Sequence, residues 1–199
     1  MLNRSTYFVR EHAGVMRLNN TYDILDPETQ EQIGIAKEKR GGSAKILRFL
    51  ISKKNLPTKI FVYEGDSYED ENKLLFYMQR GFYLFRSKIN IYDSNDNLLG
   101  WFKSKVFTLA GAFTVYDAAD NQVARIKGDR KGWNYVFLDN LESEIGTVTK
   151  KWAGVGKELF STADNYIINL NHKSAPDKTI LLLAAGLAID TVYGFFELL

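Results

Sequence analysis

The chain has 199 residues, of which 45% are hydrophobic and 25% are charged. This composition predicts one globular domain with a sizeable core and excludes a disordered chain. The formal charge of +2 is far from the concentrated positive charge that binding to a nucleic-acid backbone requires. The chain contains no cysteine, which excludes disulfides and cysteine-ligated zinc and suits the cytoplasm, where we expect the protein.

Short apolar segments alternate with polar turns through most of the chain. Turns rich in Asp and Asn, such as "DSNDN" and "DAADN", join pairs of these segments, and such residues favour tight β-turns. The repeated pattern therefore predicts β-hairpins. The hairpins begin at Tyr22, Ile89, Phe113 and Asn134, and further strands are expected over residues 5–10, 59–64, 73–80 and 82–92.

About twelve strands result, and a closed antiparallel barrel is the architecture that leaves such a meander without exposed edges. One segment departs from the strand pattern. In "GGSAKILRFLISKK", Ser43 can cap a helix, and Ala44, Leu47 and Leu50 fall on one helical face. We therefore expect one short helix over residues 43–53, packed across an end or edge of the barrel.

The most apolar segment closes the sequence, as "TILLLAAGLAIDTVYGFFELL". Its longest uninterrupted run, Ile180 to Ile189, is half of what a bilayer span needs, and Asp190 interrupts it. A tail anchor or a surface helix is the alternative, but the carboxylates and the lack of a basic run after the segment argue against both. Because the segment has no polar stripe, it must be buried on all sides. We expect a helix, starting near Pro176, that fills the barrel.

The last 55 residues or so contain a series of elements that are specific by their order and spacing rather than singly. They are Ile145-Gly146, Lys150, Trp152, Lys157-Glu158, Ala163-Asp164-Asn165, Ile189-Asp190 and Phe195-Phe196-Glu197. In this order the series resembles the C-terminal part of the phospholipid scramblase and LURP-one-related proteins, of the Tubby C-terminal-like superfamily. The resemblance implies one domain over residues 1–199, a twelve-stranded barrel around a hydrophobic C-terminal helix.

The resemblance also implies a place for calcium, in the segment before the helix. Asp164 and Asn165 match the family pattern there, but Thr162 stands where the pattern has Asp. Calcium needs six to eight oxygen ligands with several carboxylates, so we expect no metal site and no other cofactor. The sequence also has no G-x-S-x-G, H-E-x-x-H or complete phosphate-loop motif, and we expect no catalytic site.

Basic residues alternate along several predicted strands, which would place them on the outer face of the barrel. Such a patch attracts anionic lipid headgroups, and the surface charge that any barrel needs for solubility is the alternative interpretation. The candidate headgroup-binding residues are Lys103, Lys105, Arg125, Lys127, Lys150 and Lys151.

The sequence thus favours a non-catalytic, scramblase-like module that binds anionic phospholipid at the inner face of a membrane. A protein-interaction or small-ligand-binding scaffold without a membrane role is the alternative. We do not expect the isolated chain to scramble lipids, because lipid transfer needs a polar path through the hydrocarbon.

Overall fold

The computed structural model of the chain describes residues 1–12, 20–39, 57–81, 88–104, 112–129, 134–149, 165–171 and 175–191. The helix expected over residues 43–53 lies outside this part. So does the first half of the strand expected over 82–92.

The described residues form twelve strands, a 3-10 turn and one long helix. For each range in which the sequence predicted a strand, the observed strand begins or ends within a few residues of that range. The elements are β1 (Thr6–Glu11), β2 (Thr21–Leu25), β3 (Gln32–Lys39), β4 (Thr58–Glu64), η2 (Glu71–Lys73), β5 (Leu74–Arg80), β6 (Lys88–Asp93), β7 (Leu98–Ser104), β8 (Phe113–Asp117), β9 (Gln122–Gly128), β10 (Asn134–Leu138), β11 (Glu144–Thr149), β12 (Tyr166–Leu170) and α2 (Pro176–Thr191).

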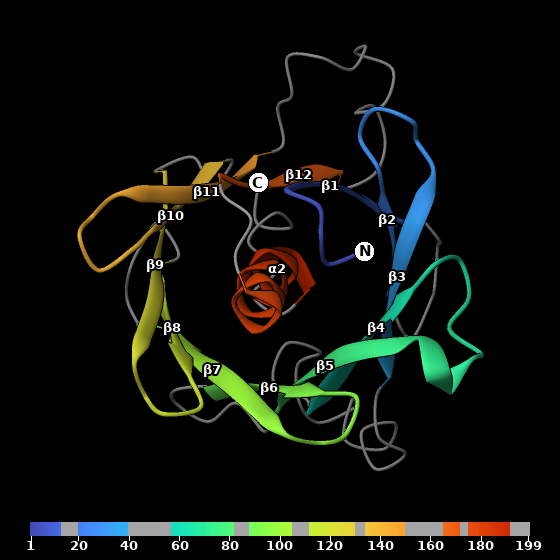
Figure 1. Cartoon of the computed structure of the whole chain (residues 1–199), viewed down its shortest axis with the longest axis horizontal. Helices are drawn as coiled ribbons and strands as arrows, with labels where there is room; N and C mark the ends of the chain where they lie inside the picture. Colours follow the sequence, from blue (N-terminus) through green and yellow to red (C-terminus); the bar gives the residue numbers. More distant parts are fainter. Residues whose placement is uncertain are drawn as a thin grey trace, which may run out of the picture.

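The strands close into an antiparallel barrel, as predicted. Each strand pairs with its neighbours in sequence, and β1 pairs with β12 to complete the ring. In that closing pair Thr6 lies opposite Asn169 and Val9 lies opposite Tyr166. Figure 1 shows α2 inside the ring of strands. Closure leaves none of the twelve described strands with an exposed edge that could pair with another chain.

The core consists of α2 and the inward side chains of the strands. Residues Ile180 to Ile189 are all buried, which confirms the prediction from their uniform apolarity. Small residues set the distance between helix and sheet: a Cβ at Gly186 would lie 2.6 Å from the Cδ1 of Ile168 on β12. The helix also packs against β7 and β8. Its neighbours are therefore protein atoms on every side that the structure describes.

Three hairpin turns share one geometry. In the β6–β7 turn the Asp93 carboxylate accepts hydrogen bonds from the backbone N–H groups of Asn95 and Asn97, at 2.9 and 2.8 Å. Asp117 and Asp139 do the same in the β8–β9 and β10–β11 turns. The side-chain amide of Asn97, and secondarily its backbone N–H, holds the pKa of Asp93 below its usual range. The Asn121 amide has the same effect on the pKa of Asp117.

These turns make part of the stability depend on pH. The folded-state pKa of Asp117 is depressed, so its stabilising contribution is present above the unfolded pKa of about 4 and disappears as the pH falls through the folded value. We expect Asp117→Asn to be less stable than the natural chain at about pH 7, and this difference to shrink at about pH 3. The difference in stability is measured from the urea unfolding midpoints of both proteins at both pH values. Asp66→Asn, in the exposed β4–β5 loop, is the charge-matched control, and an equal difference at both pH values would contradict the prediction.

Candidate functional site

The predicted basic patch is only partly within the described residues. Lys105, Lys150, Lys151 and Asp164 lie outside them, while Asn165, from the segment that resembles the family's calcium region, is described and buried.

The three described members of the patch have different surroundings. Lys127 and Arg125 on β9 both form ion pairs with Glu142 in the β10–β11 turn, Lys127 at 3.0 Å. Lys103 on β7 is exposed and lies directly opposite Lys88 on β6. Glu142 therefore offsets the charges on β9, whereas those on β6 and β7 add to each other.

A second pair of lysines has the same arrangement. Lys39 on β3 lies directly opposite Lys59 on β4, and both are exposed. Like charges at directly opposed positions destabilise a sheet. Among the ion pairs formed by described residues, none joins Lys39, Lys59, Lys88 or Lys103 to a carboxylate. The outer surface thus carries two cationic pairs that no described acid neutralises.

Aromatic rings lie between these lysines on the same outer surface. Phe61, Tyr77 and Tyr92, on three successive strands, stack with ring centroids 5.3 and 5.0 Å apart. Trp101 and Tyr116 form a second stack at 4.3 Å. We call this surface the lysine–aromatic face. It comprises Lys39, Lys59, Lys88, Lys103, Phe61, Tyr77, Tyr92, Trp101 and Tyr116, on β3 to β8.

Three of the four lysines lie over the rings. The Nζ of Lys88 is 4.3 Å from the Trp101 ring centroid, and that of Lys39 is 4.6 Å from the Phe61 centroid. Lys59 lies 5.1 Å above Tyr77. Cation–π attraction of this kind contributes roughly 0.5–1 kcal/mol at exposed sites. It orders the ammonium groups without cancelling their charge, so they stay available to an anion.

Acidic turn residues fix the rings in place. Asp96 Oδ1 accepts a hydrogen bond of 2.7 Å from the Tyr77 hydroxyl, and Asp120 Oδ1 accepts one of 2.7 Å from Trp101 Nε1. Both aspartates have a φ of +64°, where glycine would usually be favoured. Burial, and secondarily the bond to Asp96, raises the pKa of Tyr77 to about 12. Asp rather than Gly occupies these two turn positions because its carboxylate holds the ring of Tyr77 or of Trp101.

The charges of the barrel are distributed unevenly between its two ends. The hairpin turns that connect β2 to β3, β4 to β5, β6 to β7, β8 to β9 and β10 to β11 lie at one end, the turn end. The described acids in these turns and beside them are Asp26, Glu28, Glu31, Glu64, Asp66, Glu69, Asp70, Glu71, Asp93, Asp96, Asp117, Asp120, Asp139, Glu142 and Glu144. Lys39, Lys59, Lys88 and Lys103 lie at the other ends of their strands. The barrel is thus acidic at the turn end, and these lysines lie away from it.

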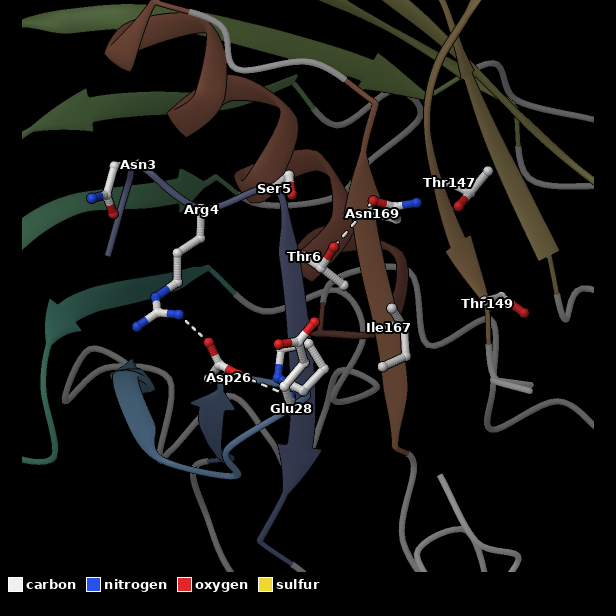
Figure 2. Close-up of a pocket in the computed structure, with 11 residues that line it drawn as sticks. Asn3, Arg4, Ser5, Thr6, Asp26, Glu28, Thr147, Thr149, Ile167 and Asn169 are labelled. Atoms are coloured by element: carbon white, nitrogen blue, oxygen red, sulfur yellow. Dashed lines mark hydrogen bonds and ion pairs between the residues drawn. The ribbon is translucent and has the colours of Figure 1, made fainter. Parts of the chain in front are cut away.

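A hollow of about 490 Å³ lies elsewhere on the outer surface, beside β1, β11 and β12 (Figure 2). Outward side chains of the three strands form its floor, and Pro27 and Glu28 of the β2–β3 turn line it together with Asn3 and Arg4. Sequence reasoning did not find this hollow, because it depends on β1 pairing with β12.

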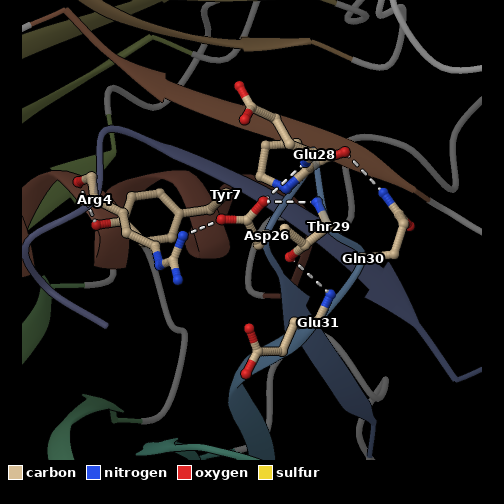
Figure 3. Close-up of polar contacts among 8 residues, drawn as sticks. Arg4, Tyr7, Asp26, Glu28, Thr29, Gln30 and Glu31 are labelled. Atoms are coloured by element: carbon tan, nitrogen blue, oxygen red, sulfur yellow. Dashed lines mark hydrogen bonds and ion pairs between the residues drawn. The ribbon is translucent and has the colours of Figure 1, made fainter.

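The wall of the hollow is held by Asp26, which is buried. One carboxylate oxygen pairs with Arg4, and the other accepts the backbone N–H groups of Glu28 at 2.8 Å and Thr29 at 3.0 Å (Figure 3). These N–H bonds, that of Thr29 foremost, hold the pKa of Asp26 below its usual range. The Tyr7 hydroxyl donates to the Arg4 carbonyl at 2.8 Å, and burial raises the pKa of Tyr7 to about 12. Arg4 thus forms part of the wall, where Asp26 neutralises its charge.

Comparison with known proteins identifies the family. A family model described as Scramblase matches residues 15–197. The chain belongs to the scramblase family. No curated protein and no solved structure matches it. The match agrees with the closed twelve-stranded barrel and its central helix.

Two further features concern membranes and metals in this scramblase-family barrel. Within the described ranges, no helix has both the length and the apolar character needed to cross a bilayer. Nor do the described His, Asp and Glu side chains gather in a group of three or more that could hold a metal ion.

Proposed function

We propose that this scramblase-family barrel is a non-catalytic module that binds anionic phospholipid headgroups at a membrane surface, through its lysine–aromatic face. The observation that carries the proposal is the pair of directly opposed lysines on β3–β4 and again on β6–β7. A protein that keeps such pairs without an acid between them loses stability, unless an anion binds there.

Lipid phosphates supply the missing negative charge. Each lysine near an anionic membrane surface contributes about 1 kcal/mol, so four of them support weak and reversible binding that salt screens. The stacked rings between them have apolar bodies and, at Tyr92, Trp101 and Tyr116, polar tips, which suits the interface between headgroups and acyl chains. The acidic turn end would be repelled by the same membrane, so one orientation is preferred.

In this orientation the protein binds peripherally to a membrane surface. If the protein is cytoplasmic, that surface is the inner face of the membrane. The proposal does not include transfer of lipids between leaflets. The apolar helix α2 is buried by the strands, so it offers lipid no surface in this conformation. A headgroup that crosses the hydrocarbon needs a polar path through it, and a barrel bound at the membrane surface does not form such a path.

The test is binding to phosphatidylserine vesicles at low and high salt. We expect the double variant Lys59→Gln/Lys88→Gln to bind about 30-fold more weakly than the natural chain at low salt, from about 1 kcal/mol per lysine. The control Lys73→Gln/Lys178→Gln makes the same change in net charge, with Lys73 beside the β4–β5 loop and Lys178 in the first turn of α2. It should bind almost as the natural chain does. Co-sedimentation measures the vesicle binding of all three proteins.

Two results would count against the proposal. Equal weakening by both double variants would show that overall charge, and not the lysine–aromatic face, drives binding. Absence of any salt-sensitive binding by the natural chain would favour the alternative function, a protein-interaction or ligand-binding scaffold.

A further inference from the structure

The hollow beside β1, β11 and β12 differs chemically from the lysine–aromatic face. Its charged lining consists of Arg4, Asp26 and Glu28. Arg4 and Asp26 neutralise each other, which leaves the Glu28 carboxylate as the uncompensated charge among the described lining groups. A phosphate or a carboxylate would therefore be repelled. The hollow is suited to an uncharged ligand or to one with no anionic group.

Its floor has a polar row. Thr147 on β11 lies opposite Asn169 on β12, and Asn169 lies opposite Thr6 on β1. Thr6 donates a hydrogen bond of 3.2 Å to Asn169 Oδ1, which leaves the Asn169 amide N–H groups and the Thr147 hydroxyl without a partner among the described residues. Neighbouring side chains in such a row are roughly 5 Å apart. Donors and acceptors at this spacing match the hydroxyl groups around a six-membered ring.

An apolar row runs beside the polar one. Ile167 lies opposite Phe8, and Phe8 lies opposite Leu25, and these three outward side chains form a small buried cluster of their own. Ile167 also lines the hollow, as does Pro27. Phe8, Leu25 and Ile167 are only 2–3% exposed, so they close this side of the hollow and leave its polar row as the surface that a ligand meets. The volume of about 490 Å³ is within the range of small-ligand sites.

We propose that this hollow binds an uncharged polyhydroxylated ring, a neutral sugar or a cyclitol. The ring edge bonds to Thr147 and Asn169 on the floor of the hollow, and Ile167 and Pro27 bound the space beside it. Figure 1 shows β11, β12 and β1 across the barrel from β5, β6 and β7. A barrel that meets a membrane with its lysine–aromatic face would therefore turn the hollow away from that membrane, toward a soluble ligand.

The experiment is a titration followed by ¹H–¹⁵N NMR, with neutral methyl glycosides and myo-inositol as the probes. Saturable shifts of the Asn169 side-chain amide are expected, with dissociation constants on the order of 1 mM because the hollow is open. Thr147→Val keeps the side-chain shape but removes the hydroxyl, and should weaken binding about fivefold. Thr114→Val, on β8, is the matched control and should leave binding unchanged.

Two further titrations define the ligand. Glycolipid vesicles present the same ring on a membrane, and stronger binding to the free glycoside identifies a soluble ligand. Sugar phosphates should bind more weakly than the neutral sugars, and Glu28→Gln should reduce that difference. The proposal is overturned if no neutral ring shifts the Asn169 amide saturably, or if Thr147→Val and Thr114→Val bind alike. Vesicle binding through the lysine–aromatic face is measured separately, so either proposal can fail alone.

Discussion

Gly100→Ala should destabilise the barrel by about 3 kcal/mol or more, at the upper end of what overpacking costs. Gly100 lies on β7, where α2 packs against the sheet. A Cβ at this position would overlap the backbone carbonyl oxygen of Tyr116 on β8 and come within 2.8 Å of the Cδ2 of Leu181 on α2. The carbonyl belongs to a paired strand and cannot move without breaking the β7–β8 ladder.

Gly81→Ala is the matched control, because no heavy atom of the described residues lies within 4 Å of a Cβ added there. Its stability should stay within about 0.5 kcal/mol of the natural chain. Urea unfolding followed by tryptophan fluorescence gives both free energies of unfolding. If Gly100→Ala were as stable as Gly81→Ala, α2 and β8 could not be packed against β7 as described.

Local patterns in the sequence predict most of this fold. Alternating strands and Asp-rich turns define the hairpins, and the uniform apolarity of Ile180 to Ile189 requires burial on all sides. The closing pair is different. β1 and β12 are far apart in sequence, and nothing in either strand specifies that Thr6 should lie opposite Asn169. The barrel could be inferred, but its closing register and the hollow that this register creates could not.

The candidate face was predicted only in part, for a similar reason. Alternation places Lys103 on the outer surface, but whether its charge is offset depends on the neighbouring strands. Arg125 and Lys127 have the same strand pattern, yet Glu142 from the next hairpin pairs with both. Lys39 and Lys59 were missed because 18 intervening residues, 40–57, separate β3 from β4 and leave their register undetermined. In "KIFVYE" and "KINIYD", a Lys that shares one face of the strand with aromatic residues was a usable signal.

The structure also explains a choice that the sequence leaves puzzling. Asp96 and Asp120 occupy left-handed turn positions, where glycine would relieve backbone strain. Each instead reaches back to the outer face, Asp96 to Tyr77 and Asp120 to Trp101. Acids of the turn end thus order the rings over which Lys59 and Lys88 lie. The two charged regions of the barrel are connected through these contacts.

The central claim is that α2 is enclosed by the barrel and sealed from solvent. Because the chain has no natural cysteine, a single introduced thiol reports on one position without background. Leu183→Cys places a thiol in α2 where the native side chain is 0% exposed, and the smaller side chain fits without overlap. Leu141→Cys makes the same substitution in the β10–β11 turn, where the native leucine is 85% exposed.

The measurement is the rate of thiol labelling by a water-soluble reagent in the native protein, without detergent or lipid. The thiol at position 183 should react on the order of a hundredfold or more slowly than that at position 141, because its exposure requires opening of the barrel. Comparable labelling rates at the two positions, with the rest of the chain still folded, would show that the helix is not enclosed and would contradict the account.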